Sequence, residues 1–360
     1  MPVLSLLTLN RTLLARQFLL RRETRSVADT LEHLVGMQAQ IPDAPYIGLW
    51  SRLAGFRPGD LSDLVTSRQA VRMALMRNTL HLVTADDCLA LRPVVQRLLA
   101  RAYAKANPDK LKAIVEAGRL IVEAQPRTNV ELGRLLLGQF PGYDAITLGY
   151  AIRNHAALVQ LPPRGVWGQR GAAVLTTAES WIGRPLSSSS AAGDMIRRYL
   201  TAFGPATVAD MTAWSGLPGL KEDVERLRST LRVVHDDRGR ELFDVPHGVW
   251  ARASTAAPVR FLPEYDNVLV AYADRSRIVP DEHRQRSMRQ IGWRVVLVDG
   301  FARAFWRLDR CQAAATLDVE LLDATAVRAK GAIEREGQRL LAFVAPDART
   351  TRVRCSCARL

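Results

Sequence analysis

The sequence contains little cysteine, and the cysteines it has form no pattern. Its four cysteines are scattered along 360 residues, apart from the pair Cys355 and Cys357. This spacing matches neither a disulfide framework nor the paired ligands of a structural zinc site. The sequence also shows no apolar run long enough to cross a bilayer and no signal peptide. We therefore expect reduced thiols, no structural metal and a cytoplasmic protein that does not contact membranes.

Lysine is scarce, although the chain is strongly basic. Only five of the 50 basic residues are lysine, and the formal net charge is +14 with a pI near 10.3. An Arg-rich genome would explain the Arg/Lys ratio but explains the net charge less easily. A surface of this sign attracts phosphate backbones, and arginine makes two-pronged contacts with phosphate and with the guanine edge. The composition therefore predicts a nucleic acid as the partner.

The motifs of several enzyme classes are missing. The sequence has no P-loop, no Gly-x-Gly-x-x-Gly, no His-Glu-x-x-His and no Gly-x-Ser-x-Gly. Its six histidines stand alone, without the neighbouring ligands that a metal centre needs. We therefore expect neither a nucleotide cofactor nor a catalytic metal.

A short helical pattern is present in three copies. Each copy opens with Ser/Thr-x-x-Asp/Glu, continues as an apolar helical run and ends at Gly, with Pro just beyond. In such a capping box the hydroxyl accepts from the backbone N–H three residues on, and the acid reaches back. The glycine ends the helix where a left-handed residue is needed. The copies are Ser26–Gly36, Thr128–Gly138 and Thr207–Gly216.

Each copy is followed by a further helix and by two extended runs around a turn. Helix, capped helix, helix and hairpin are the order of a winged helix-turn-helix. We predict an α+β fold of three such units in tandem and a β-rich C-terminal segment. In that segment we expect strands over Val268–Tyr272, Arg294–Val298, Ala304–Leu308 and Thr316–Leu321, and a closing helix over Ala324–Phe343. The predicted domains are 1–106, 107–186, 187–257 and 258–360.

Only the first copy places two glutamines in its turn, Gln38 and Gln40 around Ala39. By spacing alone, a Gln-x-Gln sequence in a solvated turn is unremarkable. Pro42 and Pro45 restrict the backbone, and Gly36 permits a tight left-handed turn, which together favour a shaped turn over a flexible one. This turn is therefore the candidate active site of the first unit.

Four segments carry a resemblance to a known family. They are Gly36–Pro42, Met76–Val83, Leu262–Leu269 and Ala273–Val279, supported by Val298-Asp299-Gly300 and Trp306-Arg307. With them the sequence resembles, over essentially its whole length, the AlkZ-like winged-helix DNA glycosylases of the azinomycin-resistance type. The resemblance implies a C-shaped protein around duplex DNA. It also implies a catalytic Gln-Φ-Gln motif, here with a small Φ residue, Ala39, which leaves the shape of the pocket open.

The implied activity is the monofunctional removal of bulky N7-alkylguanine adducts, including interstrand crosslinks, to leave an abasic site. This activity implies double-stranded DNA carrying alkylated guanine as the partner, a monomeric enzyme, no cofactor, and a role in base excision repair that could extend to antibiotic self-resistance. N7-alkylation puts a positive charge on guanine and weakens the C1′–N9 bond, so neutral amides that hold a water suffice. Gln38 and Gln40 are the predicted catalytic residues.

Further candidates support this site or contact DNA. His81 is equally consistent with a functional residue and with an ordinary strand residue, and Asp274 with Arg275 could form a buried structural pair. The arginines at the wing tips either contact phosphate or are solvated. The candidates are Arg77, His81, Arg164, Arg170, Arg238, Arg240, Tyr265, Asp266, Asn267, Asp274, Arg275 and Arg277. The alternative functions are a non-catalytic winged-helix transcription regulator and a glycosylase for small lesions such as 7-methylguanine.

Overall fold

The structure is a computed structural model that describes residues 2–103, 105–284, 294–311 and 313–358. The first 106 residues form five main helices and a hairpin, in the predicted order. The helices are α1 (Leu6–Arg16), α2 (Val27–His33), α3 (Ala44–Arg52), α4 (Pro58–Thr66) and α5 (Ala85–Leu99). The strands are β2 (Met37–Gln38), β3 (Ala70–Ala74) and β4 (Leu80–Thr84). The predicted hairpin around Arg77 is confirmed, with a short 3₁₀ turn at Met76–Asn78 as its tip.

The second segment repeats this order, but its strands join those of the first. It contains α6 (Pro108–Ala124), β5 (Arg127–Thr128), α7 (Asn129–Leu137), α8 (Ala145–His155), β6 (Leu158–Gln160), β7 (Val174–Thr177) and α9 (Ala178–Ile182). Strand β6 pairs with β3, so that Arg72 lies opposite Gln160. The result is one six-stranded sheet in the order β2-β4-β3-β6-β7-β5. The sheet therefore crosses the predicted boundary at residue 106.

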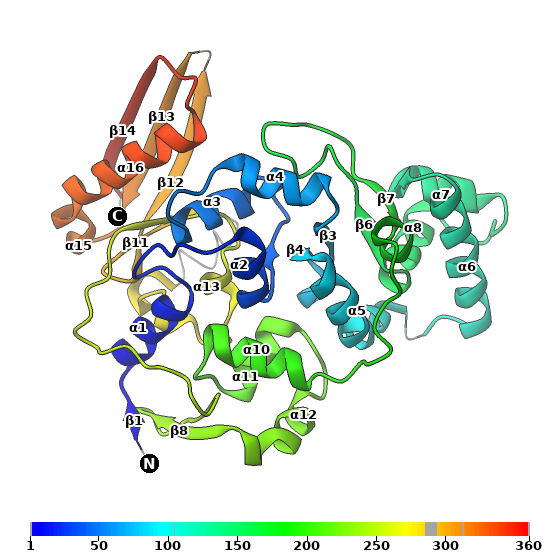
Figure 1. The fold of residues 1–360 in the computed structure, drawn as a ribbon, viewed down its shortest axis with the longest axis horizontal. Helices are drawn as coiled ribbons and strands as arrows, with labels where there is room; N and C mark the ends of the chain where they lie inside the picture. The colour runs from blue at the N-terminus through cyan, green and yellow to red at the C-terminus, as the bar shows by residue number, and fades with distance from the viewer. Residues whose placement is uncertain (1, 104, 285–293, 312, 359–360) are drawn as a thin grey trace.

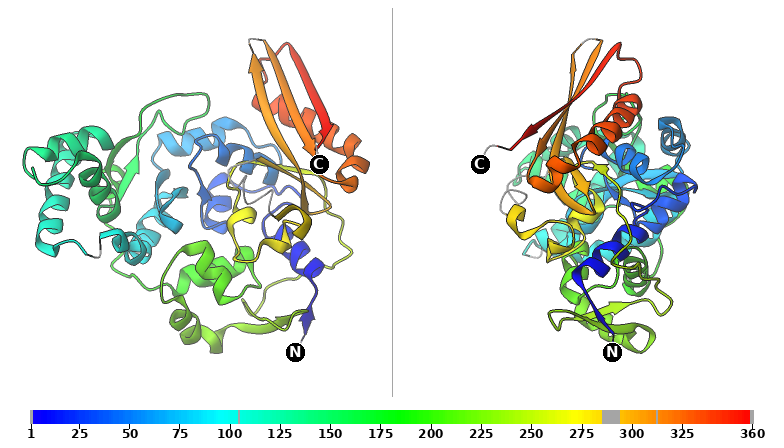
Figure 2. Two further views of the ribbon diagram at one scale, coloured as in Figure 1. Left: turned by 180° about the vertical axis from the view of Figure 1, so that it is seen from behind. Right: turned by 90° about the vertical axis from the view of Figure 1, so that its left-hand side faces the viewer.

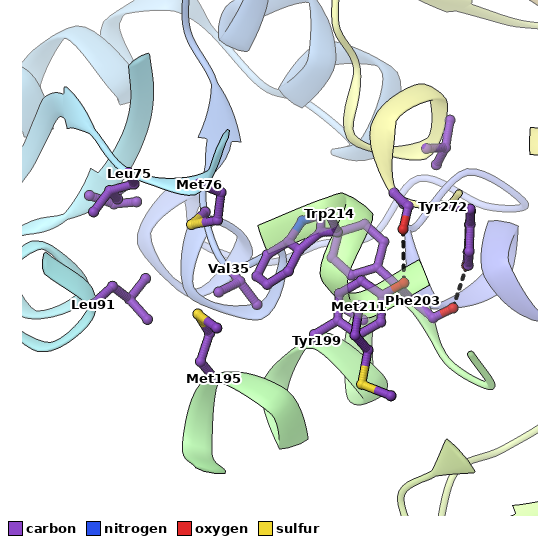
Figure 3. Close-up of a cluster of buried hydrophobic side chains, with 14 of the residues drawn as sticks. Val35, Leu75, Met76, Leu91, Met195, Tyr199, Phe203, Met211, Trp214 and Tyr272 are labelled. Atoms are coloured by element: carbon purple, nitrogen blue, oxygen red, sulfur yellow. Dashed lines mark hydrogen bonds between the residues drawn. The ribbon is translucent and has the colours of Figure 1, made fainter. Parts of the chain in front are cut away.

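The third segment is also tied to the first. It consists of α10 (Gly193–Phe203), α11 (Val208–Ser215), α12 (Leu220–Leu227) and the hairpin β8 (Arg232–Asp236) and β9 (Glu241–Asp244), and the N-terminal strand β1 (Val3–Leu4) pairs with β8. Figure 3 shows the core that the two segments share, where Val35 and Met76 of the first lie beside Trp214 of the third. In the same core Tyr199 donates a hydrogen bond to the carbonyl of Ala271, at 2.8 Å.

The C-terminal segment is a five-stranded sheet that projects from the rest of the molecule with α16 along it (Figures 1 and 2). Its elements are β10 (Arg260–Leu262), α13 (Asn267–Val270), β11 (Arg294–Val298), β12 (Phe301–Cys311), β13 (Ala314–Leu321), α15 (Ala324–Arg328), α16 (Lys330–Val344) and β14 (Thr350–Cys357). Two expectations fail here. The stretch predicted as a strand over Val268–Tyr272 begins as helix α13, because the Asp266 carboxylate caps it by accepting from the backbone N–H of Val268. The predicted last helix is divided in two and is followed by strand β14.

The three capped helices are present, but one copy departs from the expected N-terminal cap and another from the expected C-terminal glycine conformation. Ser26, Thr128 and Thr207 all accept from the backbone N–H three residues on, but the acid reaches back only in the second and third copies. Gly36 and Gly216 adopt the expected left-handed conformation, with φ of +81° and +74°. Gly138 stays right-handed at φ −63°, so the expectation for that glycine was wrong. Across the described residues, no helix combines the length and apolar character needed to cross a membrane.

Candidate active site

The Gln38–Gln40 turn is fixed by backbone contacts on both sides. Gly36 turns the chain after α2, and β2 then pairs with β4 so that Gln38 lies opposite His81. The backbone N–H of Ala39 donates to the carbonyl of Leu80 at 2.8 Å, and the buried guanidinium of Arg72 donates to the carbonyl of Ala39 at 2.6 Å. Gln38 is 7% exposed, whereas Gln40 is exposed. The turn is therefore rigid, with one glutamine held inside and one at the surface.

Gly36 is required at its position, which gives a first prediction. A Cβ there would lie 2.5 Å from Cγ1 of Val83 and 3.0 Å from the carbonyl oxygen of Leu82, at a φ that L-residues avoid. We expect Gly36→Ala to lower the free energy of unfolding by about 2–4 kcal/mol, from backbone strain and overpacking together. Gly59→Ala is the matched control, since a Cβ at Gly59 meets no atom within 4 Å. Urea unfolding of both variants is the measurement, and equal losses would contradict this account of Gly36.

Asn267 and Asp266 support the turn from the C-terminal segment. The amide of Asn267 donates to the carbonyl of Gly36 at 2.9 Å and to that of Leu34 at 3.4 Å. Asp266 forms a two-pronged ion pair with Arg52, at 2.7 and 2.8 Å, and both side chains are fully buried. These two sequence candidates cannot touch DNA from buried positions. They hold the backbone that leads into Gln38 and that carries Tyr265.

Arg77 binds the first glutamine directly. Its Nη2 donates to Oε1 of Gln38 at 2.8 Å, and its Nη1 donates to the carbonyl of Trp214 at the end of α11. Gln40 is held less firmly, because its Oε1 accepts only from the backbone N–H of Leu80 at 3.4 Å. The two glutamines therefore differ in burial and in the strength of the hydrogen bonds that their side-chain oxygens accept.

A cavity of about 700 Å³ opens beside both glutamines. The first segment contributes Asn78 and Thr79 from the hairpin, and Tyr265 lies at its edge. The opposite wall comes from the second segment, with Asn129, Tyr150 and Gln160 among its residues. The carbonyl oxygens of the Asn78, Asn129 and Gln160 side chains are buried without a hydrogen-bond partner. None of the described residues that line the cavity is an acid or a histidine.

His81 does not belong to this cavity. The side chain is 2% exposed, and Nδ1 lies 3.0 Å from the carbonyl oxygen of Thr79. Burial, and to a lesser extent the nearby charge of Arg77, lowers the pKa of His81 to about 3. The imidazole is therefore neutral at physiological pH, and the strand interpretation of His81 is the one that the structure favours.

The buried neutral His81 gives a second prediction. Unfolding restores a pKa near 6.5, so the unfolded chain binds a proton below that pH while the folded chain does not until about pH 3. The free energy of unfolding therefore falls as the pH falls through this window. We expect the wild-type protein to lose about 2 kcal/mol more between pH 7 and pH 5 than a His81→Gln variant. Denaturant unfolding at both pH values tests this, and parallel losses would contradict it.

The predicted wing-tip arginines have different environments. The loop that carries Arg164 and Arg170 lies against the first segment, where the carbonyl of Gly165 accepts from the Tyr46 hydroxyl at 2.8 Å. Arg164 donates to the carbonyl of Gly171, whereas Arg170 is exposed. This loop is therefore packed on the protein rather than projecting as a free wing. Contact of Arg164 or Arg170 with DNA stays a prediction.

The arginines of the third hairpin are held in ion pairs. Arg238 and Arg240 pair with Asp274 at 3.1 and 3.0 Å, and Arg240 also pairs with Asp236. Asp274 thus pairs with these arginines and with Arg284, and the possible Asp274–Arg275 pair does not form. Contact of Arg238 or Arg240 with phosphate stays a prediction, and it would compete with these ion pairs.

Two arginines of the C-terminal segment, two residues apart, differ in burial and in their partners. Arg277 is 3% exposed, donates to the carbonyl of Pro205 at 2.6 Å and lies over the ring of Tyr272, so its role is structural. Arg275 is half-buried beside Arg77, and burial lowers its pKa. No described acid pairs with Arg275. Contact of Arg275 with a phosphate stays a prediction.

Among the residues that the structure describes, Glu282, His283 and Asp323 lie close enough together to be possible metal ligands. Arg303 lies among them, with its Nη1 2.6 Å from Asp323 and 3.6 Å from Glu282. The carboxylates are therefore neutralised by a guanidinium. The arrangement is that of an ion-pair network.

Comparison with known proteins assigns the chain to a family. A model described as "DNA glycosylase AlkZ-like" matches residues 31–343, a span that contains Gln38, Gln40 and most of the C-terminal segment. The chain belongs to the AlkZ-like DNA glycosylase family. The resemblance seen in the sequence motifs is thereby confirmed, and membership places the chain in a family of DNA glycosylases.

This AlkZ-like chain is similar to a protein described as an interstrand DNA cross-link repair glycosylase from Streptomyces sahachiroi. The two are 26% identical over 320 residues, which cover 81% of this chain and 85% of the relative. The solved structure of the S. sahachiroi DNA glycosylase AlkZ superimposes with a TM-score of 0.80 at 20% identity, over 99% of this chain and 100% of the other. This match confirms the mixed α+β fold over the whole chain.

Sequence reasoning missed the far wall of the cavity and the buried arginines behind the turn. Asn129, Tyr150 and Gln160 lie on α7, α8 and β6. No local motif marks Tyr150 or Gln160, and Asn129 stands out only as part of the second capped helix. No sequence motif singles out Arg52 or Arg72, yet both are at most 2% exposed. For Arg72 the sequence did offer one indication of burial, because it is flanked by apolar residues on a short strand whose residues are all buried.

Proposed function

We propose that this AlkZ-like chain is a monofunctional DNA glycosylase that hydrolyses the N-glycosidic bond of bulky N7-alkylguanine, including interstrand crosslinks, and leaves an abasic site. Three features support this proposal. They are membership of the family, the similarity to a relative named for crosslink repair, and the cavity beside Gln38 and Gln40.

The lining of the cavity carries the chemical argument. Gln38 and Gln40 offer neutral amide groups, and the described lining residues include no carboxylate that could act as a strong general base. Such a site can hydrolyse only a bond whose leaving group is already activated. N7-alkylguanine meets this condition because its ring is cationic before the reaction begins.

The reaction then needs positioning more than proton transfer. The C1′–N9 bond breaks with both electrons passing to N9, which neutralises the alkylated ring and leaves an oxocarbenium-like sugar. A water held by Gln38 and Gln40 adds through its oxygen to C1′, and its excess proton passes to solvent through the open side of the cavity. Holding the water in line with C1′ is the main contribution of the two amides.

The fold supports a duplex as substrate. We infer that the three helix-and-hairpin segments are winged helix-turn-helix units that form a C-shaped surface around DNA, with the protein acting as a monomer. The net charge of +14 favours binding to phosphate. Arg275 and the exposed Arg170 are the arginines we expect to contact it. Protection of a host against its own alkylating antibiotic is a role consistent with this substrate.

The proposal is tested with a panel of defined duplexes. Each carries one guanine adduct, graded from 7-methylguanine through a bulky aromatic N7 adduct to an N7–N7 interstrand crosslink. We expect strand cleavage at the adduct after alkali treatment, greater for the bulky adducts than for the methyl adduct. Binding without cleavage on any duplex would instead support a non-catalytic regulator, and cleavage restricted to 7-methylguanine would support a small-lesion enzyme.

A further inference from the structure

The two glutamines of the turn have unequal hydrogen-bond partners. The oxygen of Gln38 accepts a charge-assisted hydrogen bond from Arg77 at 2.8 Å, inside the protein. The guanidinium has no acceptor capacity, so this bond fixes which end of the amide faces Arg77. The Nε2 group of Gln38 is thereby turned away from Arg77, and no described residue accepts from it. The Nε2 group is therefore the end of the Gln38 side chain that is available at the cavity, which Gln38 lines.

Arg77 is itself held in one position. It occupies the tip of the first hairpin with φ of +55°, and it donates a second bond to the carbonyl of Trp214 in the third segment. Gly216 packs against it from the same helix end, where a Cβ would come within 3.1 Å of the Arg77 Cα. No described acid pairs with Arg77. Burial lowers the pKa of Arg77 to about 10, so the group remains charged at neutral pH.

Gln40 has no comparable partner. Its oxygen accepts from a neutral backbone N–H at 3.4 Å in an exposed setting. A carbonyl oxygen has two lone pairs, so this oxygen can still accept a hydrogen bond from water. By contrast, the cation at Gln38 draws electron density from the amide oxygen, which weakens it as a second acceptor and strengthens the N–H groups as donors.

We propose that Arg77 is a positioning residue that fixes Gln38 as the hydrogen-bond donor of the pair and leaves Gln40 as the acceptor. This rests on the proposed function. The attacking water then accepts from Nε2 of Gln38 and donates to Oε1 of Gln40, and its remaining lone pair points at C1′. The C-terminal end of α11 belongs to the catalytic apparatus through its carbonyl contact with Arg77.

Two isosteric variants separate these roles. Gln38→Glu places a carboxylate against Arg77 and removes the only donor of that side chain, so we expect single-turnover base release to slow on the order of 100-fold. Gln40→Glu keeps an acceptor and makes it a stronger base, so its rate is expected to stay within about tenfold of the wild type. Both rates are measured at neutral pH on the bulky-adduct duplex, and the affinity for the same duplex is measured alongside.

A double-variant cycle tests Arg77 itself. Arg77→Gln should slow base release about tenfold in the wild-type background and have almost no effect in the Gln38→Ala background, because a residue that acts through Gln38 has nothing left to position. A purely structural role would slow both backgrounds equally. Arg21→Gln, at a side chain that is 82% exposed, controls for the loss of one positive charge. If Arg77→Gln fails to fold, the comparison of the two glutamate variants decides alone.

The outcomes distinguish this inference from the function on which it rests. Equal losses in the two glutamate variants, with an active wild type, would overturn the division of roles and leave the glycosylase proposal standing. A wild-type protein that releases no base from any duplex would overturn both. A slow Gln38→Glu beside a nearly normal Gln40→Glu, with the non-additive cycle, is the expected result.

Discussion

A variant with alanine at both Gln38 and Gln40 is expected to bind alkylated duplex with nearly unchanged affinity and to release base at least about a thousandfold more slowly. The reason is that the two amides are the only groups of the turn at the cavity, and their described hydrogen bonds are the one from Arg77 to Gln38 and the one from the Leu80 backbone to Gln40. The fall should appear in the single-turnover rate, because the water is ordered by these side chains only during the reaction.

Base release and duplex binding are measured on the same preparation, with thermal unfolding to show that the variant folds. Exposed Gln338→Ala on α16, remote in sequence from the turn, controls for the loss of a glutamine. A double variant that folds and works at the wild-type rate would show that the water is held elsewhere. Lost binding with a proportionate loss of rate would assign the glutamines to DNA recognition instead.

Replacing Arg52 with methionine is expected to cost about 3–5 kcal/mol of the free energy of unfolding. The change leaves the Asp266 carboxylate buried without its cation, and it also removes the bond from Arg52 to the carbonyl of Gly48. Because Asp266 caps α13 and follows Tyr265, we expect the edge of the cavity to shift as well. Urea unfolding measures the stability, and base release measures the effect on the site.

The matched control is Arg21→Met, because Arg21 pairs with Glu23 at the surface, where its side chain is 82% exposed. That loss should stay within about 1 kcal/mol. Replacing both members, as Arg52→Met with Asp266→Leu, should recover much of the stability, since no unpaired charge remains. A loss below about 1 kcal/mol for Arg52→Met alone would contradict the account of this ion pair.

The local elements of the fold were predictable because their signals are local. Capping residues, glycine ends and the alternation around Arg77 predict the helices and the first hairpin. The sharing of one sheet between the first two segments was not predictable, since it depends on two residue pairs between β3 and β6. Helix α13 was mistaken for a strand because Val268–Tyr272 is apolar and β-branched, while the deciding contact is the Asp266 cap.

In the candidate site, too, the residues marked by local motifs were predictable and the contacts that depend on tertiary packing were not. Gln38 and Gln40 were found through motifs that lie close together in the sequence, and Arg77 through the same resemblance. Its bond to Gln38 depends on how the hairpin packs against the end of α11, which no spacing reveals. Asn267 was named as support, but its action on the Gly36 and Leu34 carbonyls came only from the structure. His81 lies opposite Gln38 in the sheet, where paired residues share a face, but its side chain is only 2% exposed and does not line the cavity.

The most direct test of the central claim is product analysis on a duplex with a single bulky N7-alkylguanine. The account predicts that the intact alkylated base appears free in solution by mass spectrometry, that the strand breaks only after alkali treatment, and that borohydride traps no covalent protein–DNA adduct. The free alkylated base and the alkali-dependent strand break should not appear with the Gln38→Ala/Gln40→Ala variant. A duplex that is bound by the wild-type protein but keeps its alkylated base would contradict the account.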